Sequence, residues 1–294
     1  MAITLRQLDV FEKVATCGQA TRASEMTGIT QSAVSMAIAE LERLAGAPLF
    51  DRRGRKLLLN DRGRYILPQV REIIARVASV ESFLNDSVGE PVGVLKVGAS
   101  TTIGNYLLPL LVGAFERQYP RARVLLEVGN TKQIEEAVES GAYDLGLIEG
   151  PPHIPSLKVR PWKKDELVVV VGRGHPMASA GTPTCAELAT TRWIMREVGS
   201  GTREIFEKAL SAAGIPCEIA MELGHTEAIK KAVEAGLGVG CLSRMAVQRE
   251  LDHGWLVEVK TPVNLGRTLF ILTRDSDYTS KLMSAYLSLL EEAR

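Results

Sequence analysis

Residues 31–42 read Gln-Ser-Ala-Val-Ser-Met-Ala-Ile-Ala-Glu-Leu-Glu, and this stretch decides the fold of the N-terminal part of the chain. Apolar residues recur in it at helical spacing and would face a core; they are Val34, Ile38 and Leu41. Small polar residues share another face, namely Gln31, Ser32 and Ser35. Thr30 is placed to cap the first backbone N–H groups. A helix that only packs rarely begins in this way, so the pattern predicts a polar tip that enters the major groove of DNA.

The preceding residues predict the two supporting helices of a helix-turn-helix. The first helix has an apolar stripe formed by Leu5, Leu8, Phe11 and Val14 or Ala15. Thr4 is its expected N-cap, and Cys17-Gly18 ends it. A second helix follows over residues 19–26, and Thr27-Gly28-Ile29 supplies a tight turn into the recognition helix. Helical triplets also occur in proteins that only pack, so the residues that follow matter.

Residues 48–59 predict a short β-hairpin wing with Gly54 at its turn. Basic residues gather between residues 52 and 64, against the single acidic residue Asp61; they are Arg52, Arg53, Arg55, Lys56, Arg62 and Arg64. A basic hairpin alone is usually a solvated surface, but after a polar-tipped helix it suits a phosphate backbone. The predicted contacts to double-stranded DNA are Thr30, Gln31, Ser32, Ser35, Arg52, Arg53 and Arg55.

These residues resemble the N-terminal signature of the LysR-type transcriptional regulators. The matching segments are Leu5-Arg6-Gln7-Leu8, Phe11, residues 30–35, residues 38–42 and Leu49-Phe50-Asp51-Arg52. Residues 20–23 and Asn60 depart from the family's usual residues but keep small or capping chemistry. The resemblance covers nearly the whole chain. It implies a winged helix-turn-helix, a long linker helix and a two-lobed effector domain, in an assembly that is a dimer of dimers.

Composition places the chain among soluble globular proteins. It has 294 residues, 46% of them hydrophobic, and a formal net charge of zero, so two or three domains are expected. The scattered cysteines support neither a disulfide framework nor a metal site; they are Cys17, Cys185, Cys217 and Cys241. The chain has no run of 18 apolar residues and no apolar signal core, which predicts a cytoplasmic protein without a membrane partner.

Residues 61–87 predict a long helix that Asn60-Asp61 caps and in which Pro68 is a potential kink point. Apolar residues step along it by four and three, at Ile66, Val70, Ile73, Val77, Val80 and Leu84. Such a heptad seam predicts a coiled coil between two subunits, and therefore a homodimer. The alternative is an amphipathic helix that packs against its own domain. A turn-rich segment at residues 86–91 would end this part of the chain.

Beyond residue 92 strands and helices alternate, which predicts a parallel α/β architecture. One helix is expected over residues 103–118 and a strand over residues 166–172. A later strand and the last helix would return to the first unit, so two connections cross between two lobes in a hinged clamshell. The predicted domains are 1–60 for DNA binding, 61–87 for dimerisation and 88–294 for the effector, with lobe one at 92–162 and 267–294 and lobe two at 163–266.

A ligand of such lobes is expected where strands end and helices begin. Hydroxyls and free N–H groups gather at three of these junctions, and Arg196 and Arg203 add positive charge, which predicts a small anionic effector. The residues predicted to bind it are Ser100, Thr101, Thr102, Asn130, Thr131, Glu149, Arg196, Ser200, Thr202 and His225. Each hydroxyl could instead only cap a helix, and Arg196 could form a structural ion pair. Residues 99–106 are similar to family members that serve sulfur assimilation, which makes a sulfur oxyanion a candidate.

Two other classes of protein are weighed against a regulator. An enzyme needs a nucleophile with its base, a carboxylate pair or a cofactor loop, and the chain presents none of these motifs. No catalytic residue, cofactor or metal is therefore expected. A solute-binding protein of the clamshell type shares the two lobes, but the extra N-terminal domain and the lack of an export signal argue against it. The sequence predicts a DNA-binding transcriptional regulator that a small effector controls.

Overall fold

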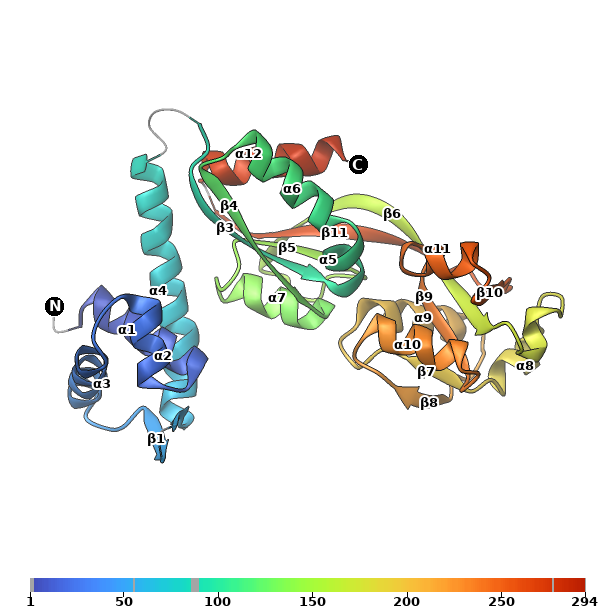
Figure 1. Ribbon diagram of the computed structural model, residues 1–294, viewed down its shortest axis with the longest axis horizontal. Coiled ribbons are helices and arrows are strands. Elements are labelled where there is room, and N and C mark those ends of the chain that lie inside the picture. The colour runs from blue at the N-terminus through green and yellow to red at the C-terminus, as the bar shows by residue number, and fades with distance from the viewer. Residues whose placement is uncertain (1–2, 55, 86–89, 277, 294) are drawn as a thin grey trace. The chain divides into compact units, whose positions relative to one another are not determined.

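The computed structural model describes residues 3–54, 56–85, 90–276 and 278–293. They form two compact units that divide near residue 88. The first unit, blue to cyan in Figure 1, contains the N-terminal helices and a two-stranded hairpin. The second unit contains the remaining strands and helices. Each unit has apolar clusters of its own, as independent domains do.

The first unit begins with three helices, α1 (Leu5–Cys17), α2 (Ala20–Thr27) and α3 (Gln31–Ala45). α1 begins at the predicted cap: the Gln7 N–H donates to Thr4 Oγ1, and the Gln7 side chain accepts from the Thr4 N–H. Gly18 ends this helix with a φ of 69°, in the left-handed region that glycine tolerates. The apolar faces of the three helices meet in one core, which includes Phe11, Val14, Ala23, Val34, Ile38 and Leu41.

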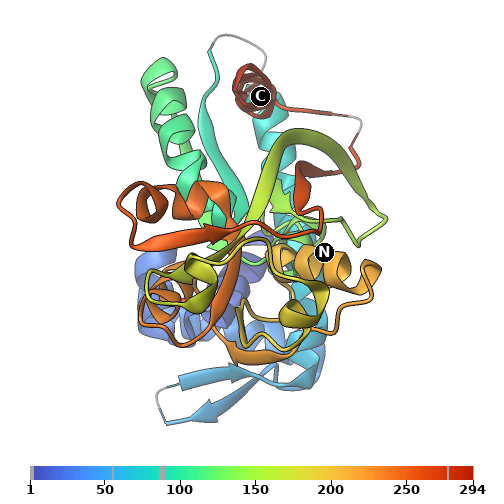
Figure 2. The ribbon, with the colours of Figure 1, turned by 90° about the vertical axis from the view of Figure 1, so that its right-hand side faces the viewer.

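A hairpin follows α3, as the sequence predicts. Strands β1 (Phe50–Arg53) and β2 (Lys56–Leu59) pair antiparallel, with Phe50 opposite Leu59. Phe50 is buried and its ring lies 5.3 Å from the ring of Phe11, which anchors the base of the hairpin on α1. The outer part of the hairpin projects from the unit, in light blue (Figure 2). Arg55 lies outside the described residues.

The predicted linker helix is α4 (Asp61–Asn85), which contains Pro68. Asn60 caps it, because its Oδ1 accepts a bond from the Gly63 N–H at 2.9 Å. The predicted apolar seam is divided between two faces. Ile66 and Val70 pack in the unit's own core, whereas Ile73 and Val80 are 42% and 58% exposed. The alternative that the sequence left open therefore holds for the first half of the seam, and the Leu84 side chain lies outside the described residues.

The first lobe of the second unit contains three parallel strands, β3 (Gly93–Ser100), β4 (Ala122–Gly129) and β5 (Leu145–Glu149). Its helices are α5 (Thr101–Tyr106), α6 (Leu108–Gln118), α7 (Thr131–Glu139) and α12 (Lys281–Glu292). α6 and α12 cover one face of the strands and α7 covers the other (Figure 1). The two faces carry separate apolar clusters, one around Phe115 and Tyr286 and the other around Ile134 and Val138.

The second lobe contains the parallel strands β7 (Trp193–Met195), β8 (Ile219–Glu222) and β9 (Val239–Ser243), with β10 (Leu256–Val259) at its side. Its helices are α8 (Cys185–Ala189), α9 (Gly201–Ala212), α10 (Thr226–Glu234) and α11 (Arg244–Asp252), and one 3-10 turn covers Pro176–Ala178. Two apolar clusters fill this lobe as well, one around Trp193 and Phe206 and one around Ile229 and Val233. The lobe therefore repeats the layered plan of the first.

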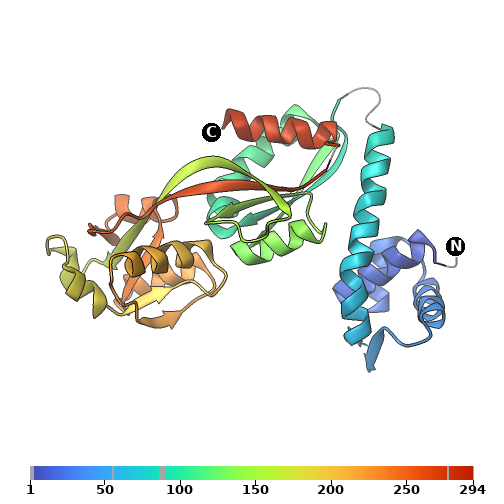
Figure 3. The ribbon, with the colours of Figure 1, turned by 180° about the vertical axis from the view of Figure 1, so that it is seen from behind.

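Two long strands connect the lobes, β6 (Leu157–Gly172) and β11 (Gly266–Arg274), which run side by side in Figure 3. Through them, nine strands of the described residues join in one sheet, ordered β4-β3-β5-β11-β6-β9-β7-β8 with β10 beside β6. The prediction of a parallel sheet is correct within each lobe and wrong for these two strands. The chain leaves the first lobe along β6 and returns along β11, so the two strands pair antiparallel.

The single helix predicted over residues 103–118 is also wrong, because two helices meet there at Leu107. Pro109 explains the break: it has no N–H to donate, and its ring would collide with the preceding turn of a continuous helix. This break leaves α5 as a short helix, and its first residues lie between the lobes. Among the helices that the structure describes, none combines the length and apolar composition needed to cross a membrane.

Candidate functional site

The tip of α3 is open to solvent on its polar side. The predicted contacts Gln31, Ser32 and Ser35 are exposed, whereas Val34 on the opposite side is buried. Thr30 accepts a bond from the Ala33 N–H at 3.2 Å, and its Oγ1 lies 3.0 Å from Ser32 Oγ. Thr30 therefore holds the first turn of the helix. The side chains of Gln31, Ser32 and Ser35 present hydrogen-bonding groups to solvent.

The wing adds cations next to this tip. Arg52 and Arg53 are exposed, and neither forms an ion pair with another described residue. A hollow opens between the start of α2, the tip of α3 and the wing, and its polar lining consists of Gln19, Thr21, Gln31, Ser35 and Arg52. Sequence reasoning missed Gln19 and Thr21, although both lie at the start of a predicted helix. The unit thus gathers hydrogen-bonding groups and the unpaired guanidinium of Arg52 around one concave surface, with Arg53 next to Arg52 on the same strand.

A second polar cluster lies between the lobes of the second unit, where helices α5, α7 and α9 begin. Six hydroxyl residues predicted at these junctions are at most 7% exposed; they are Ser100, Thr101, Thr102, Thr131, Ser200 and Thr202. Thr131 Oγ1 donates to the Glu149 carbonyl at 2.9 Å, and Thr101 Oγ1 donates to the Gly129 carbonyl at 3.2 Å. The carboxyl ends of the strands and the helix starts therefore meet, as the sequence led us to expect.

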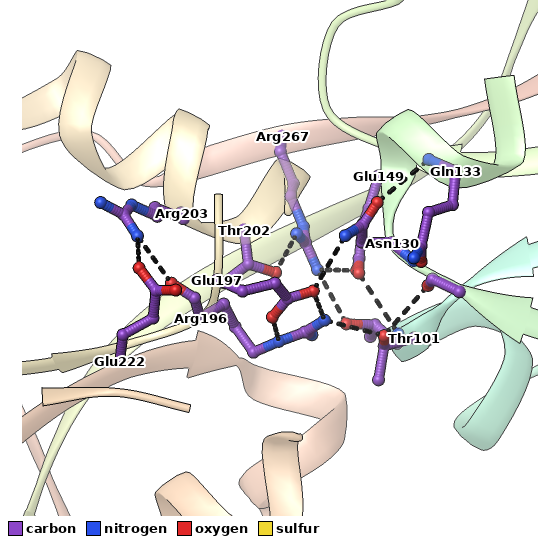
Figure 4. Close-up of polar contacts among 12 residues, drawn as sticks. Thr101, Asn130, Gln133, Glu149, Arg196, Glu197, Thr202, Arg203, Glu222 and Arg267 are labelled. Atoms are coloured by element: carbon purple, nitrogen blue, oxygen red, sulfur yellow. Dashed lines mark hydrogen bonds and ion pairs between the residues drawn. The ribbon is translucent and has the colours of Figure 1, made fainter. Parts of the chain in front are cut away.

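Arg267 is the centre of this cluster, and sequence reasoning missed it (Figure 4). Its guanidinium pairs with Glu149 and Asp165, each at 2.7 Å, and donates to Thr202 Oγ1 at 3.0 Å. The Arg267 side chain is 0% exposed. Its signal in the sequence is weak: one charge near the start of an apolar strand that follows a glycine. Because its partners come from β5, β6 and α9, it connects the two lobes.

Arg196 is the second buried guanidinium, and it forms the ion pair that the sequence left open. It donates two bonds of 2.8 Å to Glu197 and one of 3.0 Å to Thr101 Oγ1. Asn130 Nδ2 donates to the same Glu197 carboxylate at 3.2 Å. Burial acts to raise the pKa of Glu197, but the hydrogen bonds and the charge of Arg196 outweigh burial and lower the pKa below its usual range. The Arg196 cation is thus compensated within the lobe that carries it.

Charges in the cluster are nearly balanced. Two guanidinium groups face the three carboxylates of Glu149, Asp165 and Glu197. Glu149 also accepts a bond from the Thr102 N–H at 3.3 Å. The cluster therefore offers no uncompensated cation among the described residues. An anion that binds here would depend on neutral donors.

Two such donors are unused. Ser100 Oγ and Ser200 Oγ are buried and have no hydrogen-bond partner among the described residues. Both serines precede helices, and neither side chain caps its helix. A buried hydroxyl without a partner costs free energy, so native structures usually pair such a group with protein, water or a ligand. The capping alternative therefore fails for these two residues, whereas Asn130 does cap α7, with its Oδ1 3.0 Å from the Gln133 nitrogen.

The start of α9 contacts the first lobe directly. A Cβ on Gly201 would overlap the Glu149 carbonyl oxygen, so only glycine fits there. Gly199, with a φ of 92°, accepts a bond from the Lys132 N–H at 3.2 Å. Two more contacts join the lobes: Tyr106 donates to Glu227 at 2.8 Å, and His153 lies 2.9 Å from Glu204.

One predicted residue lies apart from the cluster, and the charge of another is already compensated. His225 precedes α10, is exposed, and makes none of the contacts that hold the cluster together. The cation of Arg203 is paired with Glu207 and Glu222, at 2.8 and 2.6 Å. In the part of the chain that the structure describes, no group of His, Cys, Asp and Glu side chains is placed to hold a metal ion.

Comparison with known proteins gives two matches that together span most of the chain. Residues 5–64 match the family described as bacterial regulatory helix-turn-helix protein, lysR family. Residues 89–294 match the LysR substrate binding domain. The uncharacterized HTH-type transcriptional regulator YeiE of Escherichia coli strain K12 is 40% identical over 294 residues, which cover 100% of this chain and 99% of that protein.

Solved structures of other proteins have a similar fold. A full-length OxyR variant from Pseudomonas aeruginosa has a TM-score of 0.75 at 22% identity, with 100% of this chain and 95% of that chain covered. The CcmR regulatory domain of Synechocystis PCC6803, solved in complex with 2-PG, has a TM-score of 0.64 at 29% identity. That match covers 68% of this chain and 97% of the other.

Proposed function

The chain belongs to the LysR family of transcriptional regulators, and we propose from this premise that a small anion between the two lobes controls its binding to DNA. The α3 tip and the wing would contact double-stranded DNA, and the cluster around Ser100, Ser200 and Arg267 would hold the effector. One observation carries the proposal for the effector: two buried hydroxyls from opposite lobes have no partner among the described residues.

The DNA contacts divide by chemistry. Gln31, Ser32 and Ser35 carry hydrogen-bonding side chains that suit base edges, whereas Arg52 and Arg53 carry free charges that suit phosphates. Thr30 would act mainly through the helix cap that it forms. Because Gln31 and Ser35 share one concave surface with Arg52, we propose that this hollow is part of the surface that contacts DNA.

We propose an anion as the effector, although the buried side chains of Arg196 and Arg267 are already paired with carboxylates. Neutral hydroxyls and the N–H groups at the start of α9 would hold it, because backbone donors at a helix start favour negative charge. Ser200 belongs to the second lobe and Ser100 to the first, so a ligand that bonds both would hold the lobes together. The related CcmR domain holds 2-PG in its structure, which supports a small ligand. A sulfur oxyanion is the candidate that residues 99–106 favour.

A thermal-shift experiment tests this site with the full-length chain. Sulfite, sulfate, phosphate and nitrate are added as sodium salts to the wild type, Ser200→Ala and Ser280→Ala. Ser280 is the matched control, because it precedes α12 and caps it by accepting a bond from the Met283 N–H at 3.1 Å. A ligand that binds only the folded state raises the melting temperature.

We expect at least one anion to raise the melting temperatures of the wild type and of Ser280→Ala. The same anion should raise the melting temperature of Ser200→Ala much less. Sulfate and phosphate also stabilise proteins by exclusion from their surfaces, and all three proteins share that effect. The difference between the variants therefore reports the site. Equal shifts in all three proteins for every anion would contradict the proposal.

We also propose that the protein is a homodimer, assembled further into a homotetramer, and that it acts in the cytoplasm without a membrane partner. The exposed residues Ile73 and Val80, with Val77 half-buried between them, support a contact between two copies of α4. The alternative weighed from the sequence, a clamshell solute-binding protein without a role in DNA binding, is not favoured, because residues 5–64 match the lysR-family helix-turn-helix. Salt-dependent binding of duplex DNA by the purified chain separates the two functions.

A further inference from the structure

Met36 is the most unusual residue on the surface of the recognition helix. It is 73% exposed, although methionine is usually a core residue. Met36 lies two residues from Val34 and two from Ile38, both of which are buried. Since successive residues of a helix are rotated by about 100°, Met36 points away from the core of the unit. Its side chain has no packing role in the fold of a single chain.

The surroundings of Met36 are small. On the same face of α3 the exposed neighbours are Ser32, Ser35 and Ala39, whose side chains are too short to cover it. Farther along the helix, Glu40 accepts two bonds from Arg43, at 2.8 and 2.7 Å, so its charge is compensated. Between the tip of the helix and Glu40, the face is therefore one long apolar side chain that extends beyond a row of small residues.

We propose that Met36 is a specificity-determining residue that packs against the 5-methyl group of a thymine in the major groove. This inference rests on the proposed insertion of α3 into that groove. Base edges there are polar, and the thymine methyl group is the apolar exception. A thioether donates no hydrogen bond and accepts only weakly, so over a polar base edge Met36 would remove water without replacing it. Its flexible side chain can adapt to a methyl group.

Methyl deletion tests the proposal. A duplex is selected from a random pool with the full-length wild type, and each thymine in it is replaced singly by deoxyuridine, which removes only the methyl group. Affinities are measured by fluorescence anisotropy for the wild type and for Met36→Ala. Alanine favours the helix, so the variant is expected to fold. At one thymine or more, the replacement should weaken the wild type about three- to fivefold, the effect of one buried methyl group. The same replacement should change the affinity of Met36→Ala much less.

Two further variants serve as controls. Met26→Ala removes another exposed methionine, 53% exposed on α2 rather than on the recognition helix, and should keep the full methyl effect of the wild type. Met36→Leu keeps an apolar side chain and should restore most of that effect. The sedimentation coefficient of each variant is measured beside the affinities.

The outcomes are distinct. If Met36→Ala keeps the methyl effect, or if no thymine shows one in the wild type, the inference is wrong while the proposed DNA function stands. If Met36→Ala changes the sedimentation coefficient and keeps the methyl effect, Met36 contacts a protein surface instead, and the inference is again wrong. Failure to select any duplex would overturn the proposed function and this inference together.

Discussion

At the scale of single residues, the second unit depends on Arg267. Its partners Glu149 and Asp165 lie 118 and 102 positions away in the sequence, on different strands. No local sequence pattern indicates that residues so far apart will form an ion pair. The role of this arginine was therefore not predicted, whereas the hydroxyls at the helix starts were. A hydroxyl that follows a strand has a signature within a few residues, whereas the partners of a buried charge are set by the packing of the whole unit.

Replacing Arg267 by methionine should destabilise the chain strongly. The two carboxylates that it compensates are 2% exposed, and removing one partner of a buried ion pair typically costs about 3–5 kcal/mol. Urea unfolding of the full-length chain measures the loss in the free energy of unfolding of the second unit. Arg160→Met is the matched control, because Arg160 pairs with Glu291 at the surface and should contribute at most about 1 kcal/mol. Similar losses in the two variants would show that the Arg267 network contributes no more than a surface pair.

His153 should make stability depend on pH. Burial acts to lower its pKa, but hydrogen bonds with Glu204 and Glu135 outweigh burial and raise the pKa above the ordinary 6.5. A raised pKa in the folded state means that the contribution is fully present below pH 6.5 and is lost as pH rises through the folded-state pKa. The wild type should therefore exceed His153→Gln in melting temperature more at pH 5.5 than at pH 8.5. A constant difference across that range would show that the histidine acts without its charge.

At the scale of elements, the start of α9 is the most constrained segment between the lobes. Gly201 is in contact with the Glu149 carbonyl, so Gly201→Ala forces the helix away from the first lobe. We expect a loss of at least about 1–3 kcal/mol, the usual cost of overpacking. Gly174→Ala is the control, since nothing lies near an added Cβ there and the change should stay within about 0.5 kcal/mol. Denaturant unfolding compares them, and equal stabilities would mean that the contact between the lobes is not rigid.

The two faces of α4 give a second prediction. Val70→Glu places a charge in the core of the first unit and should unfold it. Ile73→Glu changes an exposed residue and should leave folding nearly intact, but it should reduce the oligomer if two copies of α4 pack together. Circular dichroism and sedimentation velocity report the two effects. An Ile73→Glu variant that keeps the native assembly would show that the exposed face is not the subunit contact.

Much of the element order follows from local chemistry, and the failures have local causes too. Caps at Thr4, Thr30 and Asn60 set the starts of helices, and these were predicted. The break before Pro109 was missed because the apolar pattern continues through it. Only the apolar end of β6 was predicted, since its first half contains charged residues that pair with β11 rather than with a core. Helix α11 was missed because charged and polar residues outnumber apolar residues in it.

At the scale of the whole molecule, the two units differ in the kind of polar surface that they contain. Among the described residues, the first contains a concave polar surface with the unpaired guanidinium of Arg52, and the second contains a buried cluster whose two cations are compensated and whose spare donors are neutral. Free cations suit the long, strongly charged surface of DNA, and neutral donors suit one small anion. The chain as a whole is electrically neutral, so its attraction to DNA must come from how charge is distributed and not from the net charge.

The most direct test of the account is the affinity of the full-length chain for a selected duplex and for a random duplex, measured by anisotropy at several salt concentrations. Gln31→Ala and Ser35→Ala should each weaken binding to the selected duplex by about 1–3 kcal/mol and leave the random duplex nearly unaffected. Arg52→Ala should weaken both duplexes and flatten the salt dependence. If Gln31→Ala and Ser35→Ala bind the selected duplex as tightly as the wild type does, α3 does not read DNA and the central claim is wrong.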